Sequence, residues 1–252
     1  MFLIKRFFWD LIKAQYYIYL YNILKEKFFK YRNEIKSMRQ LSNEDFIFLK
    51  LNWANFLSNA PIYEAKDQEF KFILQNYQEP SREYHNLLHI KEALLDFEEI
   101  RTLLKNPLEI QMAIWYHDII YDSTKSDNEE RSGKIGLEKA RKFGFSSIFG
   151  KRVHDLILVT KDHLLSENPD SKYFIDIDLG ILGKNKFRFN EYERCIRKEY
   201  SQYPDEIYKK GRIKILKDFL GREPLYQTDY FRKKYEKNAK KNLQKRVEIL
   251  QK

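Results

Sequence analysis

Residues 112–121 read MAIWYHDIIY, an apolar run that is interrupted by one adjacent polar pair, His117 and Asp118. The apolar side chains predict a buried helix over residues 107–121, so we expect the pair to lie inside the protein. An ionised carboxylate is costly to bury without a partner, and a divalent cation is one of the few partners that hold it in its charged form. This stretch therefore predicts a helical core that carries a metal site.

Helical periodicity of apolar residues continues on both sides of this run. Ser42, with Asp45 three residues later, is typical of a helix start. The chain of 252 residues is 43% hydrophobic, which is enough for one buried core. It contains only eight Gly and six Pro, too few turn-forming residues for an all-β fold. We predict an all-α fold, with helices over residues 46–58, 63–78, 85–104, 107–121, 128–143, 146–165, 176–201, 204–220 and 229–250.

Positive charge is concentrated at the two ends of the chain. Residues 1–40 contain nine Lys and Arg against three Asp and Glu, and residues 209–252 contain fifteen against five, whereas the whole chain carries +10. Basic ends attract nucleic acid, anionic lipid or phosphorylated ligands, although the interspersed acidic residues favour solvated helix faces. The single cysteine, Cys195, excludes an internal disulfide and a cysteine-based zinc site, and it indicates a cytoplasmic protein.

The first 40 residues form a basic, aromatic extension for which we predict an extra helix. Asp10 and Lys13 interrupt its apolar run, and the longest uncharged window, 14–24, is shorter than the roughly 20 apolar residues that cross a bilayer. We expect this helix to pack on the predicted domain of residues 41–252. Contact of residues 1–36 with a membrane surface is the alternative.

Two other strings place polar side chains in apolar surroundings. In YHNLLHI, residues 84–90, His85 and His89 lie four apart and would share one face of a helix. In DIDLGILG, residues 176–183, Asp176 and Asp178 are each a candidate metal ligand or helix N-cap. Two imidazoles and two carboxylates form a mixed set of nitrogen and oxygen donors that suits one or two Mn, Fe, Co, Zn or Mg ions.

Seven motifs together resemble a known family. YHNLLHI, AIWYHDIIYD, DNEERS, TKDH, DIDLGILG, IRKEY and GRIKILKDFLGREPLY resemble, in this order, the predicted metal-dependent phosphohydrolases of the HD superfamily, in a largely uncharacterised bacterial branch. The resemblance covers roughly residues 42–250. It implies a single helical HD-domain bundle and a divalent metal cofactor, and it says nothing about the N-terminal extension.

The resemblance also implies roles for individual residues. The YHNxxH string is similar to that of the class I cyclic nucleotide phosphodiesterases, whose first and second histidines are the general acid and a metal ligand. Their other motifs are missing here, so cyclic nucleotides are not implied. By motif position, His85 is the expected general acid. The expected ligands are His89, His117, Asp118 and Asp178, with Asp176 as the rival of Asp178. Asp118 can also bridge two metals if a second is present.

Further residues are assigned more broadly. We expect His163 to bind a second metal or the substrate phosphate, and Glu129 and Glu130 to orient a ligand or to begin a helix. The candidate phosphate-binding residues are Arg82, Arg197, Lys161 and Arg212, with Arg82 and Arg197 preferred.

The expected reaction is hydrolysis, by metal-activated water, of a phosphomonoester or phosphodiester in a small substrate such as a nucleotide-like metabolite. One alternative is a non-catalytic metal-containing module that binds nucleic acid or membrane through its basic ends. Another is a metal-dependent oxygenase or lyase. The sequence contains no recognised nucleic-acid-binding module, so nucleic acid is not an expected partner of the enzyme.

Overall fold

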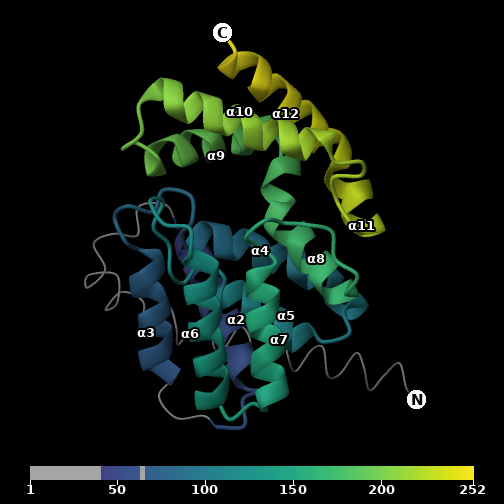
Figure 1. Ribbon diagram of the computed structural model, residues 1–252. Coiled ribbons are helices and arrows are strands. Elements are labelled where there is room, and N and C mark those ends of the chain that lie inside the picture. Colours follow the sequence, from purple (N-terminus) through teal and green to yellow (C-terminus); the bar gives the residue numbers. More distant parts are fainter. Residues whose placement is uncertain (1–40, 63–65) are drawn as a thin grey trace. The chain divides into compact units, whose positions relative to one another are not determined.

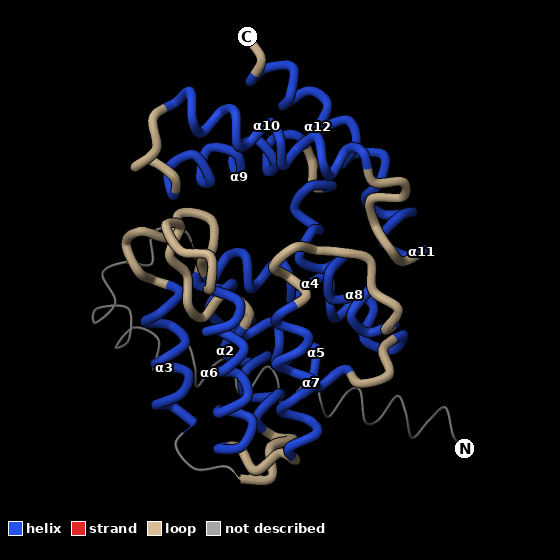
Figure 2. The backbone as a smooth tube through the Cα atoms, in the orientation of Figure 1, coloured by secondary structure: helices blue, strands red, loops and turns tan. Residues whose placement is uncertain are grey.

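The structure is a computed structural model that describes residues 41–62 and 66–252, and every regular element in these ranges is a helix (Figures 1 and 2). The predicted all-α class is thus confirmed for this part of the chain. The N-terminal extension and its predicted helix lie outside the described residues. Among the residues described, no helix has both the length and the apolarity needed to cross a membrane.

The chain divides into two compact units, Met1–Asn52 and Trp53–Lys252, whose boundary falls within helix α2 (Asn43–Leu57). In the first unit, the predicted start of α2 is confirmed by a reciprocal cap. The Asp45 backbone N–H donates to Ser42 Oγ at 3.2 Å, and the Ser42 N–H donates to Asp45 Oδ2 at 3.1 Å.

The second unit contains the remaining helices. Its first part has the order α3 (Lys66–Tyr77), α4 (Leu87–Ile100), a 3₁₀ turn η1 (Arg101–Leu103), α5 (Pro107–Tyr116), α6 (Asn128–Lys142), α7 (Ser147–Leu158) and α8 (Pro169–Asp178). A buried 3₁₀ turn, η2 (Leu179–Gly183), leads into α9 (Lys186–Glu199), α10 (Asp205–Gly221), α11 (Asp229–Phe231), a π-helical turn η3 (Arg232–Glu236) and α12 (Lys237–Leu250) (Figure 1).

An aromatic core fixes helix α5 in the middle of this unit. Trp115 is fully buried, and its ring meets Trp53 edge-on at a centroid distance of 5.4 Å. Phe70 and Phe143 also pack against Trp53. Aromatic pairs add specific geometry to the burial of apolar surface, so they hold the end of α5, directly before His117.

Several helix ends differ from the predictions, and each difference concerns the candidate site. Helix α4 begins at Leu87 because the Asn86 side chain caps it by accepting the Leu88 N–H at 2.9 Å. His85 therefore lies in the preceding turn and does not share a helix face with His89. Helix α5 ends at Tyr116, so His117 follows directly after it. Likewise, the predicted helix over 146–165 ends at Leu158.

The predicted helix over 176–201 is wrong, because the chain turns between two helices there. Asn168 caps α8, and Pro169 occupies its first turn, so the Asn-Pro pair was the overlooked start signal. Asp176 and Asp178 lie at the end of α8; Asp178 occupies the N-cap position of the 3₁₀ turn η2, but its side chain caps no backbone N–H there.

Two glycines allow the turn η2 to approach its neighbours closely. A Cβ at Gly180 would lie 2.7 Å from Asp96 Oδ2, and a Cβ at Gly183 would lie 2.3 Å from Tyr235 Cβ. No side chain fits at these distances without a shift of the surrounding structure. The turn that follows Asp178 is therefore pressed against both α4 and η3.

We expect Gly183→Ala to lower the free energy of unfolding by about 1–3 kcal/mol, because the new methyl group overpacks the contact with Tyr235. The matched control is Gly211→Ala, which lies in α10 with nothing within 4 Å of the added Cβ. This control should gain about 0.5–1 kcal/mol from higher helix propensity. Urea denaturation measures both values, and equal effects would contradict the predicted packing.

Candidate metal centre

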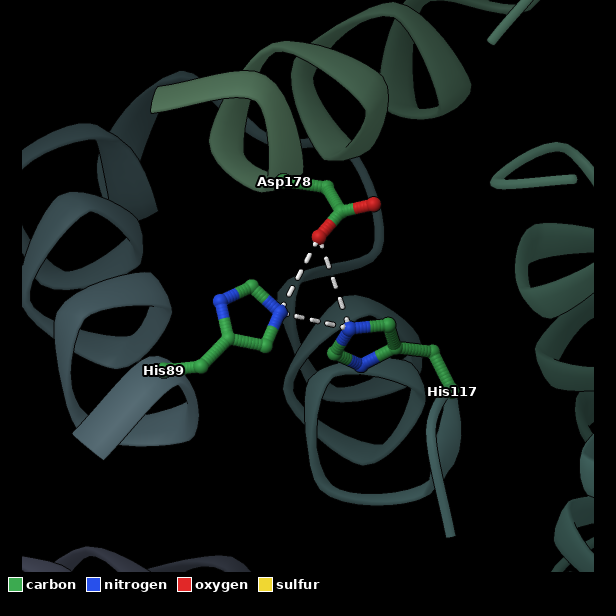
Figure 3. A group of neighbouring side chains, drawn as sticks. All are labelled: His89, His117 and Asp178. Atoms are coloured by element: carbon green, nitrogen blue, oxygen red, sulfur yellow. Dashed lines mark hydrogen bonds and ion pairs between the residues drawn. The ribbon is translucent and has the colours of Figure 1, made fainter. Parts of the chain in front are cut away.

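Helices α4, α5 and α8 pack against one another and bring three side chains together. His89 comes from the first turn of α4, His117 follows α5, and Asp178 is the last residue of α8 (Figure 3). The two imidazole Nε2 atoms are 3.0 Å apart, and Asp178 Oδ1 lies 3.1 Å from that of His89 and 3.4 Å from that of His117. This buried cluster can hold a metal ion.

Asp118 completes the cluster with a second carboxylate. Its Oδ2 lies 3.1 Å from His117 Nε2 and 3.6 Å from His89 Nε2. Ligands about 2.1 Å from an octahedral ion stand roughly 3 Å apart, so these separations suit a small divalent cation. The structure thus brings together four residues that the sequence predicts as ligands, and Asp178, not Asp176, faces the histidines.

Hydrogen bonds on the outer side of each ring direct its Nε2 toward the centre. His117 Nδ1 lies 3.0 Å from the Ile114 carbonyl oxygen, which can only accept, so Nδ1 carries a proton and Nε2 faces the centre. His89 Nδ1 lies 3.1 Å from the Tyr84 hydroxyl. Such outer partners set the tautomer and the orientation of ligating histidines.

The electrostatics of the cluster keep both carboxylates ionised. Burial by itself raises the pKa of Asp118, but His117 and the other histidines outweigh it and hold this pKa below its usual value. Asp178 behaves in the same way, with hydrogen bonds to His117 and His163 lowering its pKa far below the normal range. Burial lowers the pKa of His117, yet the two carboxylates raise it well above 6.5. Metal binding would therefore displace the Nε2 proton of His117.

His163 joins the centre from the loop after α7. Its Nε2 lies 2.7 Å from Asp178 Oδ2, the oxygen of Asp178 that does not face His89 and His117. His85 lies beside His89, so four of the five histidines are gathered at or next to the centre. The fifth, His154, pairs with Asp155 on α7.

Asp176, the predicted rival ligand, has other partners. Its Oδ1 accepts the Gln227 N–H at 2.8 Å, and its Oδ2 accepts the Thr228 N–H and hydroxyl at 2.8 and 2.6 Å. Burial raises the pKa of Asp176 to about 6, which these hydrogen bonds partly oppose. The two carboxylates of α8 consequently serve different purposes.

His85, the predicted general acid, is oriented by a residue that our sequence analysis did not single out. Its ring centroid is 6.2 Å from that of His89, and its Nδ1 lies 2.7 Å from Glu199 Oε2. The other oxygen of Glu199 accepts the backbone N–H groups of residues 83–85 at 2.7–3.0 Å. Tyr121 donates to Glu199 at 3.1 Å and stacks on His85 at 4.0 Å.

This environment determines the protonation of His85. Burial lowers the pKa of His85, but the charge and the hydrogen bond of Glu199 outweigh it, so the net shift is upward. The Glu199 side chain is fully buried, and the pKa of its carboxyl is lowered by His85 and the backbone N–H groups against the effect of burial. Nδ1 of His85 thus donates to a carboxylate, and Nε2 remains for other chemistry.

The arginines that were predicted to bind phosphate are engaged elsewhere. The Arg82 side chain is 1% exposed and donates to Glu79 and to the carbonyls of His85, Asp118 and Ile119. Arg197 binds Asp205 and the carbonyls of Tyr200 and Tyr203, while Arg212 binds Tyr192 and Glu193. Of the three, Arg82 binds carbonyls next to the cluster, whereas Arg197 and Arg212 pair with carboxylates of the protein itself.

The remaining predicted residues lie at the start of α6 and after α7. Lys161 Nζ contacts Glu130 Oε1 at 2.5 Å, and the two side chains are 37% and 41% exposed. Glu129 is half-buried, and burial together with the nearby Asp118 raises its pKa. Both glutamates lie in the first turn of α6, as expected for acids at a helix start. Glu129 is therefore the better placed of the two to influence the centre.

The two carboxylates of α8 provide a paired test of the centre. We expect Asp178→Asn to lose the bound metal, because one oxygen donor of the cluster becomes an amide nitrogen or a neutral oxygen. Asp176→Asn should keep the metal and lose about 1–3 kcal/mol of stability, since its amide nitrogen cannot accept the bonds of Gln227 or Thr228. Elemental analysis and urea denaturation measure the two effects, and metal loss in both variants would contradict the assignment.

The Glu199–His85 pair predicts a change in titration. In Glu199→Gln we expect the pKa of His85 to fall, because burial continues to disfavour the imidazolium and the opposing charge is gone. An NMR titration of the His85 ring protons measures this shift. Tyr121→Phe is the control, which retains the Glu199 charge and should keep the raised pKa. An unchanged His85 pKa in Glu199→Gln would show that the pair is not coupled.

Comparisons with family models, with curated proteins and with solved structures give no match for this chain. The resemblance to the HD phosphohydrolases therefore stays a prediction, and the function has to be argued from the centre itself.

Proposed function

We propose that this protein is a metal-dependent phosphohydrolase that cleaves a phosphomonoester or phosphodiester of a small, nucleotide-like substrate. One observation carries the proposal. A buried cluster of two imidazoles and two carboxylates lies beside His85, whose outer nitrogen is hydrogen-bonded to a buried carboxylate. Paired carboxylates and imidazoles suit a hard or borderline divalent cation such as Mn²⁺, Fe²⁺, Co²⁺, Zn²⁺ or Mg²⁺.

The ligating residues would be His89, His117, Asp118 and Asp178. A divalent cation at this position supplies Lewis acidity, which neutralises phosphoryl oxygens and lowers the pKa of water toward neutrality. The protein prepares the donors for this task in advance, because Tyr84 and the Ile114 carbonyl orient the rings of His89 and His117. Little reorganisation is then needed when the ion binds.

His85 would protonate the leaving oxygen. Glu199 holds its Nδ1, and stacking on Tyr121 fixes the plane of the ring, so the proton donor is Nε2. The raised pKa of His85 favours the imidazolium form that a general acid requires. An oriented and protonated imidazole next to a metal centre is the arrangement that phosphoester cleavage needs.

The same observation separates this proposal from a non-catalytic metal module. A structural metal site needs its ligands, but it gains nothing from a histidine that lies outside them and is held by a buried glutamate. Lys161 is the predicted phosphate-binding residue whose amine remains at the surface, with one carboxylate partner. We therefore retain it as a candidate contact for a substrate phosphate.

Two variants test this division of labour. We expect His85→Ala to keep its metal and to lose about 10²–10⁴-fold in kcat, because only the proton donor is removed. Asp118→Ala should lose both metal and turnover. The assay measures hydrolysis of p-nitrophenyl phosphate and bis(p-nitrophenyl) phosphate with added Mn²⁺, alongside elemental analysis of each protein.

His154→Ala is the matched control, because its imidazole pairs with Asp155 away from the cluster. It should keep wild-type metal content and turnover. Equal metal loss in His85→Ala and Asp118→Ala would contradict the role of His85. Bound iron with oxygen consumption and no phosphate release would replace the proposal with an oxygenase.

A further inference from the structure

His163 reaches the metal centre through an unusual backbone conformation. Its φ angle is +50°, and it is the one non-glycine residue with positive φ in the described ranges 41–62 and 66–252. A residue with a Cβ occupies this left-handed region at a cost in energy, so the surrounding structure has to hold it there. The result is that Nε2 of His163 faces Asp178 Oδ2 at 2.7 Å.

Arg222, at the end of α10, supplies contacts that hold this backbone. Its Nη1 donates to the His163 carbonyl at 2.6 Å, and its Nη2 donates to the Asp162 carbonyl at 3.3 Å. The guanidinium also lies over the Phe219 ring at 4.6 Å, and that ring is 6.2 Å from the His163 ring. One side chain thus contacts the strained peptide and the aromatic neighbour of the imidazole.

Arg222 begins a segment, residues 222–228, that we call the C-terminal strap. Within it, the Gln227 side chain donates to the Leu164 carbonyl at 3.1 Å and accepts the Ser166 N–H at 2.9 Å. The backbone N–H groups of Gln227 and Thr228 donate to Asp176 on α8. The strap therefore binds both the loop that carries His163 and the helix that carries Asp178.

The strap is itself anchored to α12. Lys240 donates to the carbonyls of Leu220 and Arg222 at 2.8 and 2.5 Å. Asp218, one turn before Arg222 on α10, accepts from Arg222 Nη2 at 2.7 Å. The Lys240 contacts thereby fix the backbone at Arg222, from which its guanidinium reaches the loop.

We propose that Arg222 is a positioning residue that holds the His163 imidazole against Asp178, and so adjusts the metal centre from the C-terminal helices. The consequence for metal affinity rests on the proposed function. The contact between His163 and Asp178 is independent of the proposed function, because it is present without a metal ion.

The test uses the full-length protein, first without metal. Histidines labelled with ¹⁵N report the hydrogen bonding of each ring by NMR, and the signal that disappears in His163→Ala identifies His163. In Arg222→Met we expect the His163 signal to move to the value that it takes in Asp178→Asn, because the imidazole leaves the carboxylate. Asp218→Asn is the matched control, since it removes only the ion pair of Arg222. Its His163 signal should stay at the wild-type value, and Arg222→Lys should recover part of the shift.

A Mn²⁺ titration then measures the effect on the metal centre. We expect Arg222→Met to weaken Mn²⁺ binding by about 10–100-fold, as the loss of outer partners of metal ligands commonly does. The double variant His163→Ala/Arg222→Met should bind no more weakly than His163→Ala, because Arg222 acts through His163.

The outcomes separate the two proposals. A wild-type His163 signal in folded Arg222→Met, or additive losses of Mn²⁺ affinity in the double variant, would overturn the positioning role. A wild-type protein that binds no Mn²⁺ would count against the metal-dependent function, while the NMR result would still decide the role of Arg222.

Discussion

The Asp178 carboxylate is the group on which the arrangement of the centre depends, because its two oxygens face different partners. Oδ1 lies within 3.4 Å of Nε2 in both His89 and His117, and Oδ2 lies 2.7 Å from His163. A buried carboxylate requires such partners to remain ionised, so it joins three helices and one loop at a single point. Asp118 adds a second negative charge beside it. Together the two carboxylates favour a positively charged partner, such as a metal ion, at this point.

The position of Asp178 depends in turn on residues far away in the chain. Gly183 allows the turn after α8 to touch Tyr235, and the Tyr235 hydroxyl donates to the buried carboxylate of Asp96 at 2.7 Å. Lys184 and Lys234 also bind Asp96, which ties α4 to the C-terminal helices. The C-terminal strap holds α8 as well, because the backbone N–H groups of Gln227 and Thr228 donate to Asp176. The last helices of the chain therefore contribute to the centre by fixing the elements on which the ligands lie.

Local sequence patterns were sufficient to find the residues of the cluster, because these residues are polar exceptions in apolar surroundings. His117 and Asp118 stand out in MAIWYHDIIY, as Asp178 does in DIDLGILG. Glu199 was missed for the opposite reason, since it lies in the polar string IRKEY, where an acid is unremarkable. Its burial and its contacts with residues 83–85 come from the packing of α9. Arg82 illustrates the same limit, because a guanidinium that donates to buried carbonyls looks in sequence like one that binds phosphate.

The sequence by itself determined the all-helical class, the cap of α2 and the kinds of donor in the centre. These features follow from periodicity, from residue chemistry and from neighbours a few positions apart. Only the tertiary structure decided that Asp178 and not Asp176 faces the histidines, that Glu199 orients His85, and that Arg222 supports His163. The physical reason is that a hydrogen bond depends on where two side chains meet in space, and contacts such as that between His85 and Glu199, 114 residues apart, leave no local pattern.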